Sequence, residues 1–175
     1  MKKSILISGL FIIILFACNN NSEKTKQQNT KDKISSIELQ NPDKKGFKSN
    51  IEKDVRGNEN YREVLYTGKH LQLVLMSLKP GEEIGAEIHV NSDQFFRFES
   101  GKGKCIINGN EYDVEGGDVI IVPAGSKHNV INTDAVKELK MYTIYALPQH
   151  KDGIIRATKK DAENNATKFD GKTTE

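Results

Sequence analysis

The sequence predicts an all-β fold, a single domain whose short strands close into a barrel or a double-sheet jelly roll. From residue 51 onward, short apolar runs are broken at close intervals by Gly, Pro, Asn and Asp, which is typical of strands joined by tight turns. The strongest turn signals are Pro-Gly at 80–81, Asn-Gly at 108–109 and Gly-Gly at 116–117. Nine strands can be placed between these breaks, a number that suits a closed or double-layered sheet.

The predicted strands follow the apolar runs in chain order. Each run has four to eight residues, the usual length of a strand, and is bounded by turn residues. We expect strands at residues 62–66, 71–78, 84–89, 94–99, 103–108, 111–114, 119–122, 128–132 and 139–145.

The first residues resemble the leader of a bacterial lipoprotein. Lys2 and Lys3 precede an apolar run at 5–16, which is shorter than the about 20 residues of a membrane span. Residues 15–18 resemble a lipobox, which implies a signal peptide at 1–17, a lipidated Cys18 and a protein anchored at the cell envelope, in the inner or the outer membrane. An ordinary secretory signal with an incidental cysteine is the alternative.

Two polar segments flank the predicted domain, which covers residues 51–150. Residues 18–50 are rich in Asn, Lys, Gln, Ser and Thr, a composition that buries too little apolar surface to fold alone. We expect a disordered tether there, although residues 34–39 could add a strand. Residues 151–175 form a C-terminal extension, with one or two helical turns at 158–164 and a frayed end.

The charge of the chain is nearly balanced. It has 26 Lys and Arg residues against 24 Asp and Glu residues, and loss of a leader with Lys2 and Lys3 leaves 24 of each. Binding to nucleic acid requires a clear excess or stripe of basic residues, so we expect no nucleic-acid partner.

Two spaced motifs lie on the predicted strands. The first is GxxxxxExHxxxxQxxxxxxG, with Gly81, Glu87, His89, Gln94 and Gly101, and the second is GxxxxxPxGxxHxxxN, with Gly117, Pro123, Gly125, His128 and Asn132. Side chains alternate between the two faces of a strand, so Glu87 and His89 point to the same side. If the strands roll into a barrel, Glu87, His89, Gln94 and His128 can converge on one ion.

The spacing of both motifs resembles that of the cupin family, whose first motif supplies three metal ligands and whose second supplies a histidine. The resemblance covers about residues 51–163, and GDVIIVPAGSKHNVIN matches the second motif in full. In the first motif, Glu87 stands where many cupins have histidine, and Gln94 where many have glutamate. The segments SDQFFRFESGKG and MYTIYALPQHKDG most resemble small cupins described as mannose-6-phosphate isomerase-like. The resemblance implies a single-domain cupin barrel, the double-stranded β-helix or jelly roll.

The resemblance also implies that Glu87, His89, Gln94 and His128 bind a divalent transition metal. Two imidazole nitrogens, one carboxylate and one amide oxygen suit Mn, Fe, Ni, Co or Zn and disfavour Cu(I). Two other roles remain open. Glu87 could be a general base beside the metal, and Gln94 could bond a neighbouring backbone group instead.

Several other residues receive predicted places. Gln72, Phe96, Phe98 and Tyr145 are candidates to line the pocket, although core packing is the alternative for the aromatic side chains. Cys105 is interpreted as a small core residue. His70 and His150 lie near strand ends, where we expect them to face solvent.

The residues support three functional hypotheses. The first is a metal-dependent enzyme that acts on a small oxygen-rich molecule, such as a sugar, a uronate or a dicarbonyl compound. The resemblance favours an isomerase, and with Fe or Mn the same ligands would support a dioxygenase. The second hypothesis is a non-catalytic envelope protein that binds a sugar or a metal. The third is a homodimer formed through an outward face with Phe95 and Ile88.

Overall fold

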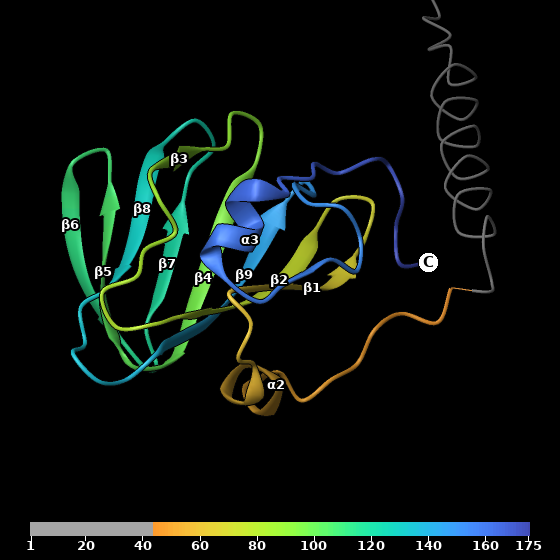
Figure 1. Ribbon diagram of the computed structural model, residues 1–175. Helices are drawn as coiled ribbons and strands as arrows, with labels where there is room; N and C mark the ends of the chain where they lie inside the picture. The colour runs from red at the N-terminus through yellow and green to blue at the C-terminus, as the bar shows by residue number, and fades with distance from the viewer. Residues whose placement is uncertain (1–43) are drawn as a thin grey trace, which may run out of the picture. The chain divides into compact units, whose positions relative to one another are not determined.

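The computed structural model describes residues 44–175 (Figure 1). The predicted signal peptide, Cys18 and most of the predicted tether lie outside the described residues. The prediction of an all-β fold is confirmed, because two antiparallel sheets contain nearly all of the regular structure.

The larger sheet has six strands in the order β10-β1-β2-β9-β4-β7. The smaller sheet has the order β3-β8-β5-β6. The strands are β1 (Arg62–Thr67), β2 (Gln72–Leu78), β3 (Glu87–Ile88), β4 (Asp93–Ser100), β5 (Lys102–Ile107), β6 (Asn110–Glu115), β7 (Val119–Val122), β8 (Lys127–Asn132), β9 (Leu139–Ala146) and β10 (Ile155–Arg156).

The core lies between the inner faces of the two sheets. Along β4 and β9 every second residue is buried, the pattern of strands with one face turned to a core. Phe96, Phe98 and Met141 have no exposed surface, and Cys105 is fully buried as predicted. Because these side chains come from both sheets, burial of apolar surface holds the layers together.

Two turns show why glycine is needed at particular positions. Asn108 and Gly109 have φ of 49° and 85°, so both central residues of the β5–β6 hairpin adopt the left-handed conformation that the dipeptide predicts. Gly101, at φ 87°, lies so close to the backbone of Glu138 and Leu139 that a Cβ would clash with both. A side chain at position 101 would therefore force the chain ahead of β9 to move.

The third predicted strand is shorter than expected. Residues 84–89 were expected to be extended, but only Glu87 and Ile88 pair as a strand. Gly85 has φ of 89°, and its N–H donates to the side chain of Asn129 rather than to a strand partner. The bend at Gly85 thus delays the start of the ladder, and pairing ends at Ile88, so His89 lies just beyond the strand.

The structure differs from the expectation of a frayed C-terminus. β10 pairs with β1, and α3 (Lys159–Asn164) begins at Thr158, whose side chain forms a capping box with Asp161. Near the end of the chain, the backbone N–H of Thr174 donates to the carbonyl of Thr67. Polar contacts to β1 thus fix a segment that has few apolar residues of its own.

The end of the predicted tether also packs on the domain. Phe47 stacks on Tyr66 with ring centroids 5.3 Å apart, and α2 (Ile51–Gly57) follows with Asn50 as its N-cap. In Figure 1, α2 lies below the larger sheet and α3 in front of it. Neither helix of residues 44–175 has the length and apolar character needed to cross a membrane.

Candidate metal centre

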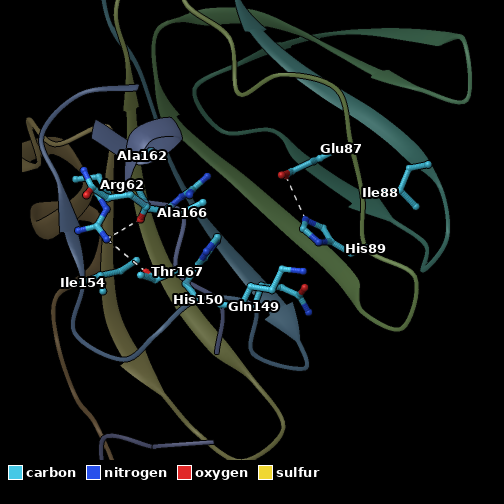
Figure 2. Close-up of a pocket in the computed structure, with 13 residues that line it drawn as sticks. Arg62, Glu87, Ile88, His89, Gln149, His150, Ile154, Ala162, Ala166 and Thr167 are labelled. Atoms are coloured by element: carbon cyan, nitrogen blue, oxygen red, sulfur yellow. Dashed lines mark hydrogen bonds and ion pairs between the residues drawn. The ribbon is translucent and has the colours of Figure 1, made fainter. Parts of the chain in front are cut away.

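Strand pairing places the first two candidate ligands opposite each other. β3 pairs with β8 so that Glu87 and His128 are direct partners in the register. His89 follows Glu87 by two residues and returns to the same side. Figure 2 shows Glu87 and His89 turned toward each other, while Ile88 between them points the other way.

Three donor atoms converge within a few ångströms. Glu87 Oε1 lies 3.2 Å from His89 Nε2 and 3.4 Å from His128 Nε2, and the ligand atoms of all three residues lie within 4.8 Å of one another. Ligands at about 2.0–2.2 Å from a metal lie about 3.0–3.4 Å apart in octahedral or tetrahedral geometry. The two measured separations match those of ligands that share one ion.

The hydrogen bond of His128 determines where its lone pair points. Its Nδ1 lies 3.2 Å from the carbonyl oxygen of Ser126, and because a carbonyl can only accept, Nδ1 must donate. In the neutral ring, Nε2 then carries a lone pair toward the Glu87 carboxylate. Two lone pairs that face each other require a cation between them, either a proton on Nε2 or a metal ion that both atoms bind.

Three buried atoms of the candidate ligands lack hydrogen-bond partners. Among residues 44–175, His89 Nε2, His128 Nε2 and Gln94 Oε1 are buried and have no hydrogen bond. The two histidine nitrogens are at ion-pair distance from Glu87 but not in hydrogen-bonding orientation. Buried polar atoms without partners are costly. The two histidine nitrogens, together with the Glu87 carboxylate beside them, therefore fit a divalent ion that has N and O ligands.

The side chain of Gln94 does not form the backbone hydrogen bond that was its alternative role. Its Nε2 donates to Thr143 Oγ1 at 3.0 Å, a contact with a side chain on the neighbouring strand β9. This contact holds the amide so that Oε1 stays free. The ligand role of Gln94 remains a prediction, with an oriented oxygen in its favour.

The charge state of Glu87 bears on its two proposed roles. Burial raises the pKa of Glu87, but the adjoining imidazoles of His128 and His89 lower it, to about 2. The carboxylate is therefore ionised at neutral pH. A base with so low a pKa accepts a proton poorly, so the electrostatics favour Glu87 as a ligand.

The structure corrects all four pocket-lining predictions, because none of these side chains lines the cavity. Phe96 and Phe98 stack on each other in the core, with centroids 6.3 Å apart, and do not line the cavity. Gln72 is fully buried and bonds the backbone of the segment after β9. Tyr145 is also buried, yet it packs edge-on against His89 at 5.2 Å. Tyr145 therefore packs against the candidate ligand His89 without lining the cavity.

A cavity of about 360 Å³ opens beside Glu87 and His89. Its far wall is formed by β1, β10 and the C-terminal segment, with Arg62, His150 and Arg156 among the lining residues. The site therefore includes residues from the extension, which the motifs did not indicate.

The expectation that His150 faces solvent is wrong. Its backbone N–H donates to Gln72 Oε1 at 2.9 Å, and its Nε2 lies 3.4 Å from the hydroxyl of Tyr145. Burial, and after it the positive charge of Arg62, lower the pKa of His150 to about 3. The sequence near His150 could not predict that this residue is held inward, because its contact with Gln72 spans 78 residues. His70 is exposed, as predicted.

The profile of the cupin domain family matches residues 74–145. This range contains all four candidate ligands, Glu87, His89, Gln94 and His128. It ends before His150 and does not include Arg62, so the far wall of the cavity lies outside the matched range.

Three relatives extend beyond that range. The chain is 47% identical over 127 residues to the uncharacterized protein YrkC of Bacillus subtilis, covering 67% of this chain and 66% of YrkC, slightly less than two thirds of that relative. It is 37% identical over 122 residues to the uncharacterized protein L612 of Acanthamoeba polyphaga mimivirus, covering 68% of this chain and 76% of L612. The crystal structure of BH2720 from Bacillus halodurans aligns with a TM-score of 0.67 and 40% identity, covering 71% of this chain and 98% of BH2720.

Proposed function

The chain belongs to the cupin domain family, and from this premise we propose that it is a metal-dependent enzyme acting on a small oxygen-rich molecule. The observation that carries the proposal is the convergence of Glu87, His89 and His128 on one point at the edge of the cavity. Substrates in keeping with a 360 Å³ cavity are sugars, uronates and dicarbonyl compounds.

The chain's own residues prepare the site in three ways. Ser126 orients His128, the ionised Glu87 supplies one negative charge, and Thr143 turns the Gln94 amide so that its oxygen is free. A divalent ion held by the candidate ligands Glu87, His89, Gln94 and His128 would supply Lewis acidity toward a substrate oxygen. By resemblance we favour an isomerase, with a dioxygenase as the alternative if the ion is Fe or Mn.

A second candidate function is supported by the pKa values. Glu87 has a pKa of about 2 and His150 of about 3, so neither is well matched to proton transfer at neutral pH. A protein that binds a sugar or metal without turnover needs no such group. We therefore propose a metal-dependent binding protein as the second candidate.

Metal analysis of protein purified without a histidine tag tests the metal site. We expect about one divalent ion per chain, lost in His128→Ala and reduced in Glu87→Gln. Glu111→Gln on exposed β6 is the matched control and should retain the ion. Full metal content in both site variants would rule out the proposed ligands.

A second measurement separates the enzyme from the binding protein. Metal-loaded protein is incubated with sugars, uronates and dicarbonyl compounds, and the products are followed by NMR. Metal-dependent conversion supports the enzyme. Binding without conversion supports the second candidate, and full binding after metal removal would contradict both.

We also propose that the protein is anchored at the cell envelope through Cys18. The lipobox-like residues 15–18 support this, and they lie outside the described part of the chain. Incorporation of labelled palmitate in a bacterial host should occur with the natural sequence and fail with Cys18→Ser. A homodimer remains a prediction, and a monomer in sedimentation would exclude it.

A further inference from the structure

Two arginines face each other at the wall of the cavity opposite the candidate ligands. Arg62 on β1 and Arg156 on β10 are direct partners in the antiparallel register, and both line the cavity. Residues directly opposite on neighbouring strands share a face, with Cβ atoms about 5 Å apart, and like charges there are destabilising. The sequence therefore places two positive charges where their mutual repulsion opposes folding.

Neither arginine is neutralised by a carboxylate. No ion pair in the part of the chain from 44 to 175 includes Arg62 or Arg156. The guanidinium of Arg156 donates to the carbonyls of Ile155 and Asn165 and to Thr167 Oγ1, so it holds the C-terminal segment. Arg156 thus has a structural role in addition to its charge.

Arg62 has no such structural partner. Its guanidinium lies over the ring of Tyr61 at 5.6 Å, and its Nε is buried without an acceptor within the described residues. Figure 2 shows Arg62 at the side of the cavity away from Glu87 and His89. A buried guanidinium nitrogen without an acceptor is costly, so the half-buried Arg62 side chain indicates an acceptor that arrives with a ligand.

The cavity as a whole is positive. Arg62, Arg156 and Lys168 line it, and Glu87 is the single carboxylate among the lining residues of the described chain. A divalent ion at Glu87 would add two further positive charges. Burial and then the charge of Arg62 lower the pKa of His150, in keeping with a positive potential there.

We propose that the cavity binds a small organic acid, whose carboxylate or phosphate group is held by Arg62 while its other oxygens face Glu87 and His89. The inference rests on the proposed function, because it names the substrate class for the same cavity. Arginine suits this task, since its planar fork donates two parallel hydrogen bonds to a carboxylate or a phosphate. A neutral sugar would leave the Arg62 charge unpaired.

The test measures binding of two anions, inorganic phosphate and malonate, by calorimetry on the metal-loaded chain. We expect saturable binding that weakens about tenfold or more in Arg62→Gln, the loss of about one strong interaction. Arg62→Lys keeps the charge without the fork and should bind with intermediate affinity. Arg56→Gln on exposed α2 removes the same charge far from the cavity and should bind as the natural protein does.

Further readouts separate a binding role from a structural one. Removing one of two facing arginines should leave the melting temperature of Arg62→Gln unchanged or higher. Its metal content should stay unchanged, because Arg62 is not a candidate ligand. The calorimetry is repeated on metal-free protein, where we expect weaker binding that still depends on Arg62, so a failed metal site and a failed anion site give different results.

The relative affinity for the two anions identifies the acidic group of the ligand. Tighter binding of phosphate assigns a phosphate ester, and tighter binding of malonate assigns a carboxylic acid. The proposal is overturned if neither anion saturates the protein by about 10 mM, which is too weak for a specific site. It is also overturned if Arg62→Gln binds as tightly as the natural protein, or if that variant melts at a lower temperature.

Discussion

Replacement of Gln72 by leucine tests whether this side chain holds the wall of the cavity. Its amide makes four hydrogen bonds: Nε2 donates to Thr67 Oγ1 at 2.9 Å and to the His150 carbonyl at 2.7 Å, and Oε1 accepts from the N–H of Gln149 at 3.2 Å and of His150 at 2.9 Å. Leucine has a similar volume and makes none of them.

The magnitude follows from the number of bonds. Each intramolecular hydrogen bond contributes roughly 0.5–1.5 kcal/mol, so the loss of four lowers the free energy of unfolding by roughly 2–6 kcal/mol. A domain has about 5–15 kcal/mol in total, so the variant should still fold. Denaturation by urea gives the free energy of unfolding of both proteins.

Two further variants sharpen the interpretation. In Gln72→Glu the carboxylate still accepts from Gln149 and His150 but faces the His150 carbonyl with an acceptor, so an intermediate loss is expected. Metal content should be nearly unchanged in both variants, since Gln72 does not contact the candidate ligands. A loss below about 1 kcal/mol in Gln72→Leu would refute the reasoning, because it would mean that the four bonds do not hold the segment.

Three other predictions concern stability and reactivity. The lowered pKa of Glu87 adds stability that is fully present above its usual value of 4.5 and is lost as the pH falls toward about 2, so denaturation of metal-free protein across this range should show a pH dependence that Glu87→Gln lacks. Gly101→Ala should lower the free energy of unfolding by about 2 kcal/mol or more, because of its positive φ and the clash with the backbone before β9, and a change below about 0.5 kcal/mol in urea denaturation would contradict this. Burial raises the pKa of Cys105 to about 11, so in Cys18→Ser protein a thiol reagent at pH 7 should react only after denaturation, and rapid reaction of the native protein would show that the core opens.

Local rules were sufficient for most of the fold. Strand positions followed from apolar runs between turn residues, and the Asn108-Gly109 hairpin formed as its backbone preferences require. The third strand shows the limit of such rules. Its apolar pattern correctly indicated a strand, but Gly85 adopts a positive φ and its N–H donates to the side chain of Asn129. This contact spans 44 residues, so no local pattern predicts it.

The candidate ligands were indicated by spacing, and their meeting depended on register. The period of two places Glu87 and His89 on one side, where their ligand atoms lie 3.2 Å apart. The β3–β8 pairing then brings the distant His128 to 3.4 Å from Glu87. Phe96 and Phe98 share a face with Gln94, yet they lie deeper along β4 and pack in the core instead of the cavity. Alternation gives a face of a strand, but the depth along that face depends on the opposing sheet.

The sequence by itself thus defines the all-β class and the turns, because these depend on contacts between near neighbours and on a repeat of two. It also indicates the candidate ligands through the spacing of the two motifs, although their meeting depends on the β3–β8 register. The far wall of the cavity depends on long-range contacts. Arg62 meets Arg156 only when β10 returns to β1, and His150 is drawn inward only because Gln72 bonds its backbone. Such pairs bring together residues 78 or more positions apart, so the charge and shape of the cavity arise only from the folded sheets.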